Sequence, residues 1–267
     1  MKNRLKNKTT RNNFITYGVV ILIYIVMQIL TASGSISSTM QGLLVPICAY
    51  VVMAISLNLT VGILGELSLG HAGFMSVGAF TGVTAAMALS GRVSSGIVCL
   101  IVGMVVGAVF AAIVGFLIGI PVLRLKGDYL AIVTLAFGEI IKGIFNNLYV
   151  GIDSNGLHMS LLSDKTDLAE GGKLIIGGPM GLTSIPRYST FTIGIILVII
   201  TLIVVFHLVS SRQGRAIMAV RDNRIAAESI GVNITKYKLM AFTVSAALAG
   251  ASGTLFAMNY STIVANK

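Results

Sequence analysis

The sequence predicts an all-α integral membrane protein, built as a polytopic helical bundle. Of its 267 residues, 55% are hydrophobic and only 10% are charged, and the mean hydropathy is +0.93. In a typical soluble domain about a quarter of the residues are charged. Apolar runs of about 18 residues or more recur along the chain, which is the length that an α-helix needs to cross a hydrocarbon core of about 30 Å.

About seven spans are expected after a basic tail, residues 1–13, and we interpret residues 14–267 as one transmembrane domain. The first span is interpreted as a retained helix rather than a signal peptide, because its apolar part exceeds a typical signal core. Two connections are long and polar: residues 151–188 and 210–238. The expected spans are 14–32, 42–62, 67–89, 96–120, 129–150, 189–209 and 239–258.

The basic residues predict the orientation. Five of them lie in the first eleven positions and six lie between Arg212 and Lys238. If the N-terminus is cytoplasmic, 13 of the 19 Lys and Arg residues face the cytoplasm and five face outward, in keeping with the positive-inside tendency. Loop 151–188 is then extracytoplasmic and loop 210–238 cytoplasmic. Topology and the lipid bilayer therefore explain the net charge of +10, and no nucleic acid is invoked.

Glycines recur at four-residue spacing within the expected spans. Small residues at this spacing allow helix backbones to approach closely, which favours helix association in lipid. We therefore expect packing seams in a compact bundle, with a second subunit as an alternative partner for one of its faces. The glycines concerned are Gly78, Gly82, Gly103, Gly107, Gly115 and Gly119.

Motifs of common enzymes are absent from the sequence. It contains no Walker-type G-x-x-x-x-G-K-[ST] loop, no H-E-x-x-H and no G-x-S-x-G. Its three histidines fall in different segments, and neither cysteine has a C-x-x-C partner. We therefore expect that this chain is not an enzyme. We also expect no catalytic residue, no metal site and no ATP site in it.

A polar segment, GELSLGHAGFMSVGAF, begins at Gly65 within apolar surroundings. Ser68 and His71 share one helical face, whereas Glu66 is expected at the membrane edge. Gly62 and Gly65 favour a sharp turn or a broken helix there, and polar side chains can satisfy the backbone groups that such a break frees. The three polar residues either line a translocation path or serve the local structure.

A second polar feature lies in the expected span 129–150. Glu139 falls close to mid-span, and Lys142 follows on the same helical side. Thr134 is five residues before Glu139 and points elsewhere. Because charge at membrane depth is costly, Glu139 is either part of a polar translocation path, with Thr134 as a further candidate, or, together with Lys142, a neutralised structural pair or a helix-packing contact.

The loop 210–238 contains SRQGRAIMAVRDNRIAAESIGVNITKYK. Its apolar positions alternate with charge in a manner typical of short amphipathic helices. Arg221, Asp222 and Arg224 are compatible with a solvated cytoplasmic face. The same mixture of small, apolar and charged residues also suits docking into a groove of a soluble partner.

Four motifs together resemble a known family. They are LNLTVGILGELSLGHAGFMSVGAF, LRLKGDYLAIVTLAFGEI, GGPMGL and GRAIMAVRDNRIAAESIGVNITKYKLMAF. Their order and spacing over roughly residues 42–260 resemble the permease subunits of high-affinity branched-chain amino-acid ABC importers, and the M-type subunit most closely. The resemblance implies an ABC-importer permease fold in a bacterial inner membrane.

The resemblance also implies partners and a mechanism. A second permease forms a heterodimer with this chain, two cytoplasmic ATPases bind the ATP, and an extracytoplasmic protein delivers leucine, isoleucine or valine. Transport then proceeds by alternating access without covalent chemistry or a cofactor of this chain. AAESIG is similar to the EAA-type coupling loop of ABC importers. Its acidic and glycine positions match Glu228 and Gly231, and the expected coupling residues are Arg221, Ala226, Ala227, Glu228 and Gly231.

The sequence departs from the family in one respect and leaves alternatives open. Family members usually continue with further apolar segments, so the resemblance implies a truncated product here, or helices supplied from elsewhere. Relatives on a similar scaffold carry urea or short amides. From a different class, a proton-coupled secondary transporter or channel would use Glu139 without any ATPase.

Overall fold

The computed structural model describes residues 2–91, 93, 95–125, 127–153, 156–161 and 172–265, with side chains from residue 13 onward except at 156, 157, 161 and 173. Predictions that concern Arg92, Lys126, Lys165, Lys267 and residues 162–171 fall outside this part of the chain. The helices are α1 Lys2–Ala32, α2 Ser38–Asn58, α3 His71–Ser90, α4 Gly96–Val122, α5 Asp128–Asn146, α6 Phe191–Ser210, α7 Arg212–Asp222, α8 Arg224–Ser229 and α9 Ile234–Ala257, and the strands are β1 Leu148–Asp153, β2 Gly156–Leu161 and β3 Lys173–Gly177.

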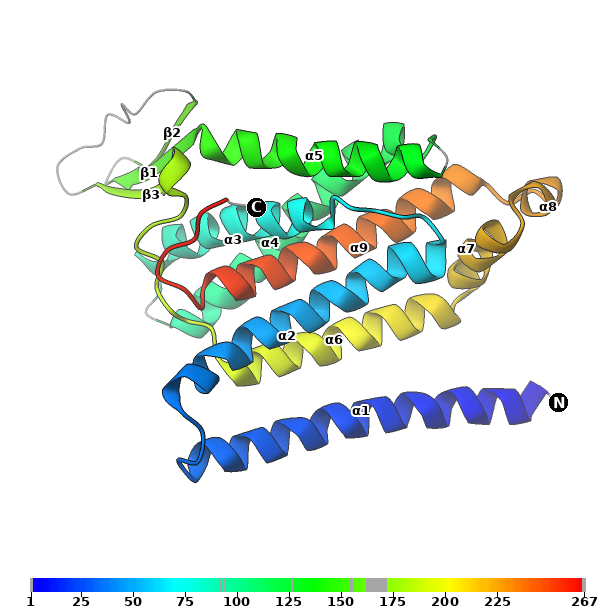
Figure 1. The fold of residues 1–267 in the computed structure, drawn as a ribbon, viewed down its shortest axis with the longest axis horizontal. Helices are drawn as coiled ribbons and strands as arrows, with labels where there is room; N and C mark the ends of the chain where they lie inside the picture. Colours follow the sequence, from blue (N-terminus) through cyan, green and yellow to red (C-terminus); the bar gives the residue numbers. More distant parts are fainter. Residues whose placement is uncertain are drawn as a thin grey trace.

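The helical membrane fold predicted from the sequence is confirmed. Among the described residues, six helices are long and apolar enough to cross a membrane: Asn13–Ala32, Ser38–Leu64, His71–Ser90, Gly96–Val122, Phe191–Ser210 and Ile234–Ala257. The remaining expected span, 129–150, corresponds to α5, which has 19 residues and is not among the six. It carries Asp128, Glu139 and Lys142, yet it runs between the same two ends of the bundle as the others (Figure 1).

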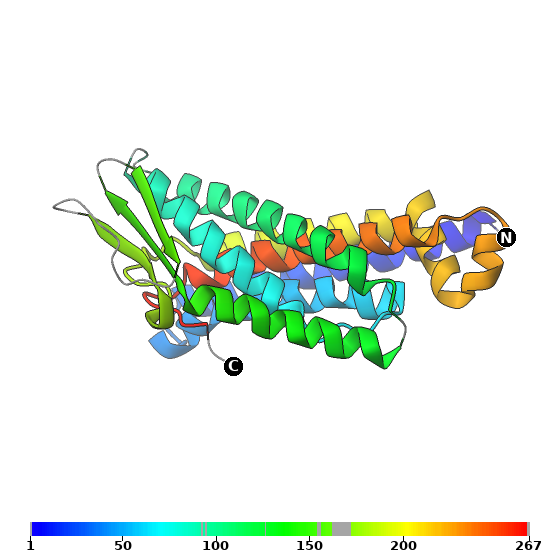
Figure 2. The same cartoon turned by 90° about the horizontal axis from the view of Figure 1, so that it is seen from above.

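The connections gather at the two ends of the bundle in the groups that the sequence predicts. The start of α1, the α4–α5 connection, α7 and α8 lie at one end, while the three strands lie at the other (Figures 1 and 2). Helix α1 borders α6 at the edge of the bundle, where Tyr24 and Thr192 share a hydrogen bond of 3.2 Å between their hydroxyls.

Helix α9 occupies the centre of the bundle and packs against α2, α3 and α4. The backbones approach closely because glycines lie at the contacts: a Cβ atom added to Gly78 would lie 2.1 Å from the carbonyl oxygen of Gly250 on α9. At each of the six glycines of the expected seams, an added Cβ would come within 2.7 Å of an atom of a neighbouring helix. These contacts form one glycine seam, which joins α3, α4 and α9.

Side-chain caps explain where the helices after the strands begin. Thr190, Ser211, Asn223 and Asn233 precede α6, α7, α8 and α9, and each accepts a hydrogen bond from a backbone N–H in the first turn. Such caps satisfy donors that have no partner within the helix. The loop 210–238 therefore folds as two short helices and the first turn of α9.

The expected end of the span 129–150 is wrong, because α5 ends at Asn146 and β1 follows. An apolar run as short as LYVGID cannot be assigned to helix or strand from its periodicity alone. Strand β1 pairs in antiparallel fashion with β2 and β3, in the order β2-β1-β3, so part of the predicted loop 151–188 is a small sheet.

The GGPMGL motif follows β3 and meets the segment after α9. Leu182 and Ile263 exchange backbone hydrogen bonds of 2.7 and 3.1 Å. Gly181 has a φ of +69°, and a Cβ there would lie 2.0 Å from the carbonyl oxygen of Ile263. Glycine is therefore required at this position both by the conformation and by the neighbouring backbone. The sequence alone did not reveal this role.

Candidate functional site

The chain breaks its helical course between α2 and α3. A π-helix, Leu59–Leu64, extends α2, and Gly65 ends it in the left-handed conformation at a φ of 79°. Residues 65–70 are then non-helical, and α3 begins only at His71. The break expected at Gly62 and Gly65 is present, but the expected helical start at residue 67 is wrong because the first part of this crossing is not helical (Figure 1). We call residues 59–70 the elbow.

Thr134 on α5 supports the non-helical part of the elbow. Its Oγ1 accepts a hydrogen bond of 3.0 Å from the backbone N–H of Leu69, and it donates one of 2.9 Å to the carbonyl oxygen of Ala131. Its side chain is buried. Gly70 lies directly against Thr134, whose carbonyl oxygen would be 2.0 Å from an added Cβ. Backbone groups freed by a break at membrane depth need such internal partners.

His71 belongs to a buried group of polar side chains. Its Nε2 lies 2.8 Å from the Oγ of Ser56 on α2. Thr60 donates from its Oγ1 to the Oγ of Ser245 on α9 at 2.9 Å, and Ser245 donates in turn to the carbonyl oxygen of Ser56. Four polar residues from α2, the elbow, α3 and α9 are thus connected by hydrogen bonds. Sequence reasoning missed three of them, since nothing in a single sequence reveals which hydroxyls of different spans face one another.

Two polar atoms near the elbow are buried without a hydrogen-bond partner in the described part of the chain: the Oγ of Ser68 and the Nδ1 of His71. The two residues are 4% and 3% exposed. A buried polar atom that lacks a partner costs about 1–3 kcal/mol. Such atoms indicate a position for a water molecule or for a polar group of a ligand.

Glu66, directly after Gly65, forms an ion pair with Lys238 on α9. The two side chains are 15% and 9% exposed, so the pair is largely withdrawn from solvent. In the sequence Lys238 is one of the basic residues of the loop 210–238, and nothing there indicates its partner. The pair connects the elbow to the first turns of the central helix.

Glu139 does not join the other path candidates. It lies on the outer face of α5 with a side chain 59% exposed, 3.7 Å from the ammonium group of Lys142. A Cβ added to its neighbour Gly138 would lie 3.7 Å from the Cα atom of Gly70, so Glu139 lies at the level where α3 begins. The structure thus brings Glu66, Ser68, His71 and Thr134 to the elbow, and leaves Glu139 on the opposite side of α5 from Thr134.

Arg221, at the end of α7, points to the elbow. Its Nη1 donates a hydrogen bond of 2.9 Å to the carbonyl oxygen of Gly62, and its guanidinium also pairs with Asp222 at 2.9 Å. Its Cγ would be 2.5 Å from a Cβ added to Gly65. Beside it, Leu64, Ile217 and Ala241 form a small buried cluster. Helix α7 and the elbow are therefore in direct contact.

Helix α8 carries the other coupling candidates. Ala227 is buried against Val220 and Ile234, whereas Ala226 and Glu228 are exposed. Gly231 follows at a φ of +85° and donates a backbone hydrogen bond of 3.0 Å to the carbonyl oxygen of Glu228. The large apolar side chains Ile225 and Ile230 are 81% and 77% exposed beside Glu228.

Within the described residues, no group of three or more His, Cys, Asp or Glu side chains could hold a metal ion. Cys48 and Cys99 are free and buried.

The chain is similar to known transport permeases. Residues 39–267 match the family described as "Branched-chain amino acid transport system / permease component". Over 228 residues the chain is 37% identical to the high-affinity branched-chain amino acid transport system permease protein LivM of Escherichia coli (strain K12), and 35% identical to that of Salmonella typhimurium (strain LT2). Each alignment covers 78% of this chain and 50% of the relative, so the chain spans about half the length of these curated relatives.

A shorter likeness concerns a different transport system. Over 90 residues the chain is 33% identical to the autoinducer 2 import system permease protein LsrC of Enterobacter sp. (strain 638), which covers 33% of this chain and 26% of that protein. No solved structure matches the chain.

Proposed function

Because the chain belongs to the family of branched-chain amino acid transport system permease components, we propose that it is the membrane-spanning permease subunit of an ATP-driven importer of branched-chain amino acids. The chain holds part of the translocation path and couples it to separate ATPase subunits. It has no ATP site of its own and needs no cofactor. Its partners are a second permease, two cytoplasmic ATPases and an extracytoplasmic substrate-binding protein.

The observation that carries this proposal is the surface of α8. Ile225 and Ile230 expose large apolar side chains beside the carboxylate of Glu228, on a short helix at one end of the bundle. Exposed apolar residues around a charge are typical of a helix that docks in the groove of a partner. We call Ile225, Glu228 and Ile230 the docking surface, and we propose that it binds in a groove of an ATPase subunit.

The contacts of α7 support a route for the mechanical signal. When ATP closes the ATPase dimer, α8 moves with its docking groove and α7 moves with α8, because Ala227 packs against Val220. Helix α7 in turn holds the elbow through Arg221 and Gly62. A shift of the elbow changes the position of the segment that carries Ser68 and His71 and so opens the path to one side or the other.

The docking surface also defines the orientation of the molecule in the membrane. The end of the bundle with α7 and α8 is cytoplasmic, together with the basic start of α1, and the three strands face the outside. The sheet and the GGPMGL segment then lie where a substrate-binding protein approaches. The membrane concerned is the inner membrane of a bacterium.

Charge reversal on α8 tests the proposal. In the complex reconstituted with its ATPases in proteoliposomes, Glu228→Arg is expected to lower ATPase binding and ATP-driven leucine uptake at least about tenfold, equivalent to ~1.4 kcal/mol of docking free energy. Membrane insertion is expected to be unchanged. Asp128→Arg, an exposed charge reversal at the same end of the bundle, serves as the matched control. Normal ATPase binding and uptake by Glu228→Arg would overturn the assignment of the docking surface.

A further inference from the structure

A small cavity lies between the first turn of α3 and helix α5. It has a volume of about 280 Å³. Gly70 of the elbow and Gly73 of α3 present backbone to it, while Glu139 and Lys142 contribute the charged side chains from α5. Leu69 and Leu135 add apolar surface. We call this cavity the seam pocket; it is close to the lower end of the size range of small-molecule sites.

The charged residues of the seam pocket lie at membrane depth, where contact with lipid is unfavourable. Gly138 of α5 lies beside Gly70, so Glu139 and Lys142 are level with the start of α3, between the two ends of the bundle. Charged side chains at membrane depth normally face a protein partner, water or a substrate. The 59% exposure of Glu139 leaves its carboxylate open to such a neighbour.

The ion pair between these residues leaves most of their binding capacity free. The distance from the Nζ of Lys142 to the Oε2 of Glu139 is 3.7 Å, which is longer than a charge-assisted hydrogen bond. A carboxylate can accept about four hydrogen bonds and an ammonium group can donate three. A ligand that carries both charges can therefore bind both residues without leaving either of them unpaired.

We propose that the seam pocket binds the zwitterionic head of an aliphatic α-amino acid, with its ammonium group on Glu139 and its carboxylate on Lys142. This inference rests on the proposed function and names a substrate subsite within it. The aliphatic side chain of the ligand lies against Leu69 and Leu135, which are 52% and 51% exposed. The second permease covers the open side of the pocket. A neutral ligand such as urea has no charge to offer to either residue.

Equilibrium binding to the purified complex in nanodiscs tests this subsite. The probes are radiolabelled leucine, 4-methylpentanoate, which lacks the ammonium group, and 3-methylbutylamine, which lacks the carboxylate. Glu139→Gln is expected to weaken leucine binding about tenfold or more and to leave 4-methylpentanoate binding unchanged. Lys142→Gln is expected to weaken leucine binding similarly and to leave 3-methylbutylamine binding unchanged. The proposal would be overturned if Glu139→Gln weakened the binding of leucine and 4-methylpentanoate equally, or if Lys142→Gln weakened the binding of leucine and 3-methylbutylamine equally. Unchanged leucine binding in either variant would also overturn it.

A charge-swapped variant separates ligand binding from a structural role. Glu139→Lys combined with Lys142→Glu keeps an ion pair at the same two helical positions. The proposal expects normal thermal stability with leucine binding weakened about tenfold, because the two charges are exchanged. Full leucine binding in this variant would show a purely structural pair and overturn the proposal. Asp128→Asn, at the start of the same helix, is the control and is expected to bind leucine normally.

Failure of the subsite is distinguishable from failure of the proposed function. The ATPase subunits are expected to co-purify with the Glu139 and Lys142 variants. These two residues lie on α5, whereas the docking surface lies on and beside α8, at one end of the bundle (Figure 1). Normal leucine binding with co-purified ATPases would reject the seam pocket alone. Loss of the ATPases from the wild-type complex would reject the proposed function instead.

Discussion

The Nη1 of Arg221 donates a hydrogen bond of 2.9 Å to the carbonyl oxygen of Gly62, and this bond joins α7 to the elbow. Gly62 lies in the π-helix that extends α2, three residues before the left-handed Gly65. Carbonyl groups near the end of a helix have no partner within it, and a cationic side chain is a favourable one. A residue expected from the sequence to belong to the coupling loop thus contacts the elbow directly.

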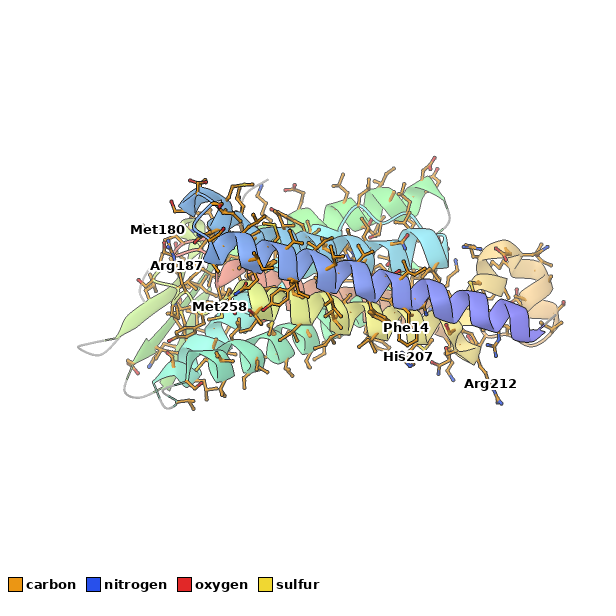
Figure 3. The ribbon with its side chains drawn as sticks, turned by 90° about the horizontal axis from the view of Figure 1, so that it is seen from below. Phe14, Met180, Arg187, His207, Arg212 and Met258 are labelled. Carbon is orange, nitrogen blue, oxygen red and sulfur yellow. The ribbon has the colours of Figure 1, made fainter. Side chains whose placement is uncertain are left out.

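Replacement of Arg221 is predicted to separate docking from transport. Arg221→Ala removes the bond to Gly62 but leaves the docking surface intact. Since the side chain is partly exposed, solvent screening leaves ~1 kcal/mol for this contact, which corresponds to roughly a fivefold loss of uptake. ATPase binding, measured by co-purification, should stay normal. Arg212→Ala is the control, because Arg212 is exposed beyond the end of α6 (Figure 3); loss of ATPase binding in Arg221→Ala would contradict the internal role.

Removing one member of the Glu66–Lys238 pair is predicted to lower the free energy of unfolding more than removing both charges. Removing one partner of a buried ion pair costs about 3–5 kcal/mol, because the other charge stays buried and unpaired. Lys238→Met is therefore expected to lower the free energy of unfolding in denaturing detergent by about that amount, and Glu66→Gln added to it to restore more than half. Lys236→Met, at an exposed position on the same helix, should have little effect. Equal losses in the single and double variants would argue against the pairing.

The glycine seam is predicted to tolerate no added side chain. A Cβ at Gly78 would lie 2.1 Å from the carbonyl oxygen of Gly250, so Gly78→Ala forces α3 and α9 apart. The expected cost is about 1–3 kcal/mol of unfolding free energy, the usual range for an overpacked interior. Gly143→Ala on α5 is the matched control, since no atom lies within 4 Å of the added Cβ. A Gly78→Ala variant as stable as Gly143→Ala would contradict the packing described.

Thr134 is predicted to act through its hydroxyl group. Thr134→Val keeps the shape of the side chain but leaves the backbone N–H of Leu69 without its acceptor. The penalty for a buried unpaired donor is about 1–3 kcal/mol, and thermal unfolding of the purified complex should reveal it. Thr134→Ser retains the hydroxyl and should recover most of the stability. If valine and serine behave alike, the hydrogen bond does not support the elbow.

The spans could be predicted from the sequence because each depends only on local apolar length. The run from Gly96 to Val122 and the run from Phe191 to Ser210 identify their helices without any tertiary information. The glycine positions on the seam also follow from local spacing. The break at Gly62 and Gly65 was foreseen in the same way, from glycine and the polar residues that follow it.

The features that were not predicted depend on contacts between distant segments. Helix α3 begins only at His71, after a non-helical segment. Thr134, 63 positions after His71, stabilises that segment by accepting a hydrogen bond of 3.0 Å from the backbone N–H of Leu69. The strand β1 is specified by its neighbours β2 and β3 rather than by its own periodicity. Likewise, the partners of Glu66 and Arg221 lie on other helices. A single sequence does not contain those pairings in readable form.

The most direct test of the central claim is the energy source of transport. Leucine uptake is measured in proteoliposomes that hold the complete complex, with ATP or a non-hydrolysable analogue inside and with or without a proton gradient. The account predicts uptake that requires hydrolysable ATP, is insensitive to a protonophore and is lost in Glu228→Arg. Uptake that continues without ATP, follows the proton gradient and survives Glu228→Arg would contradict it.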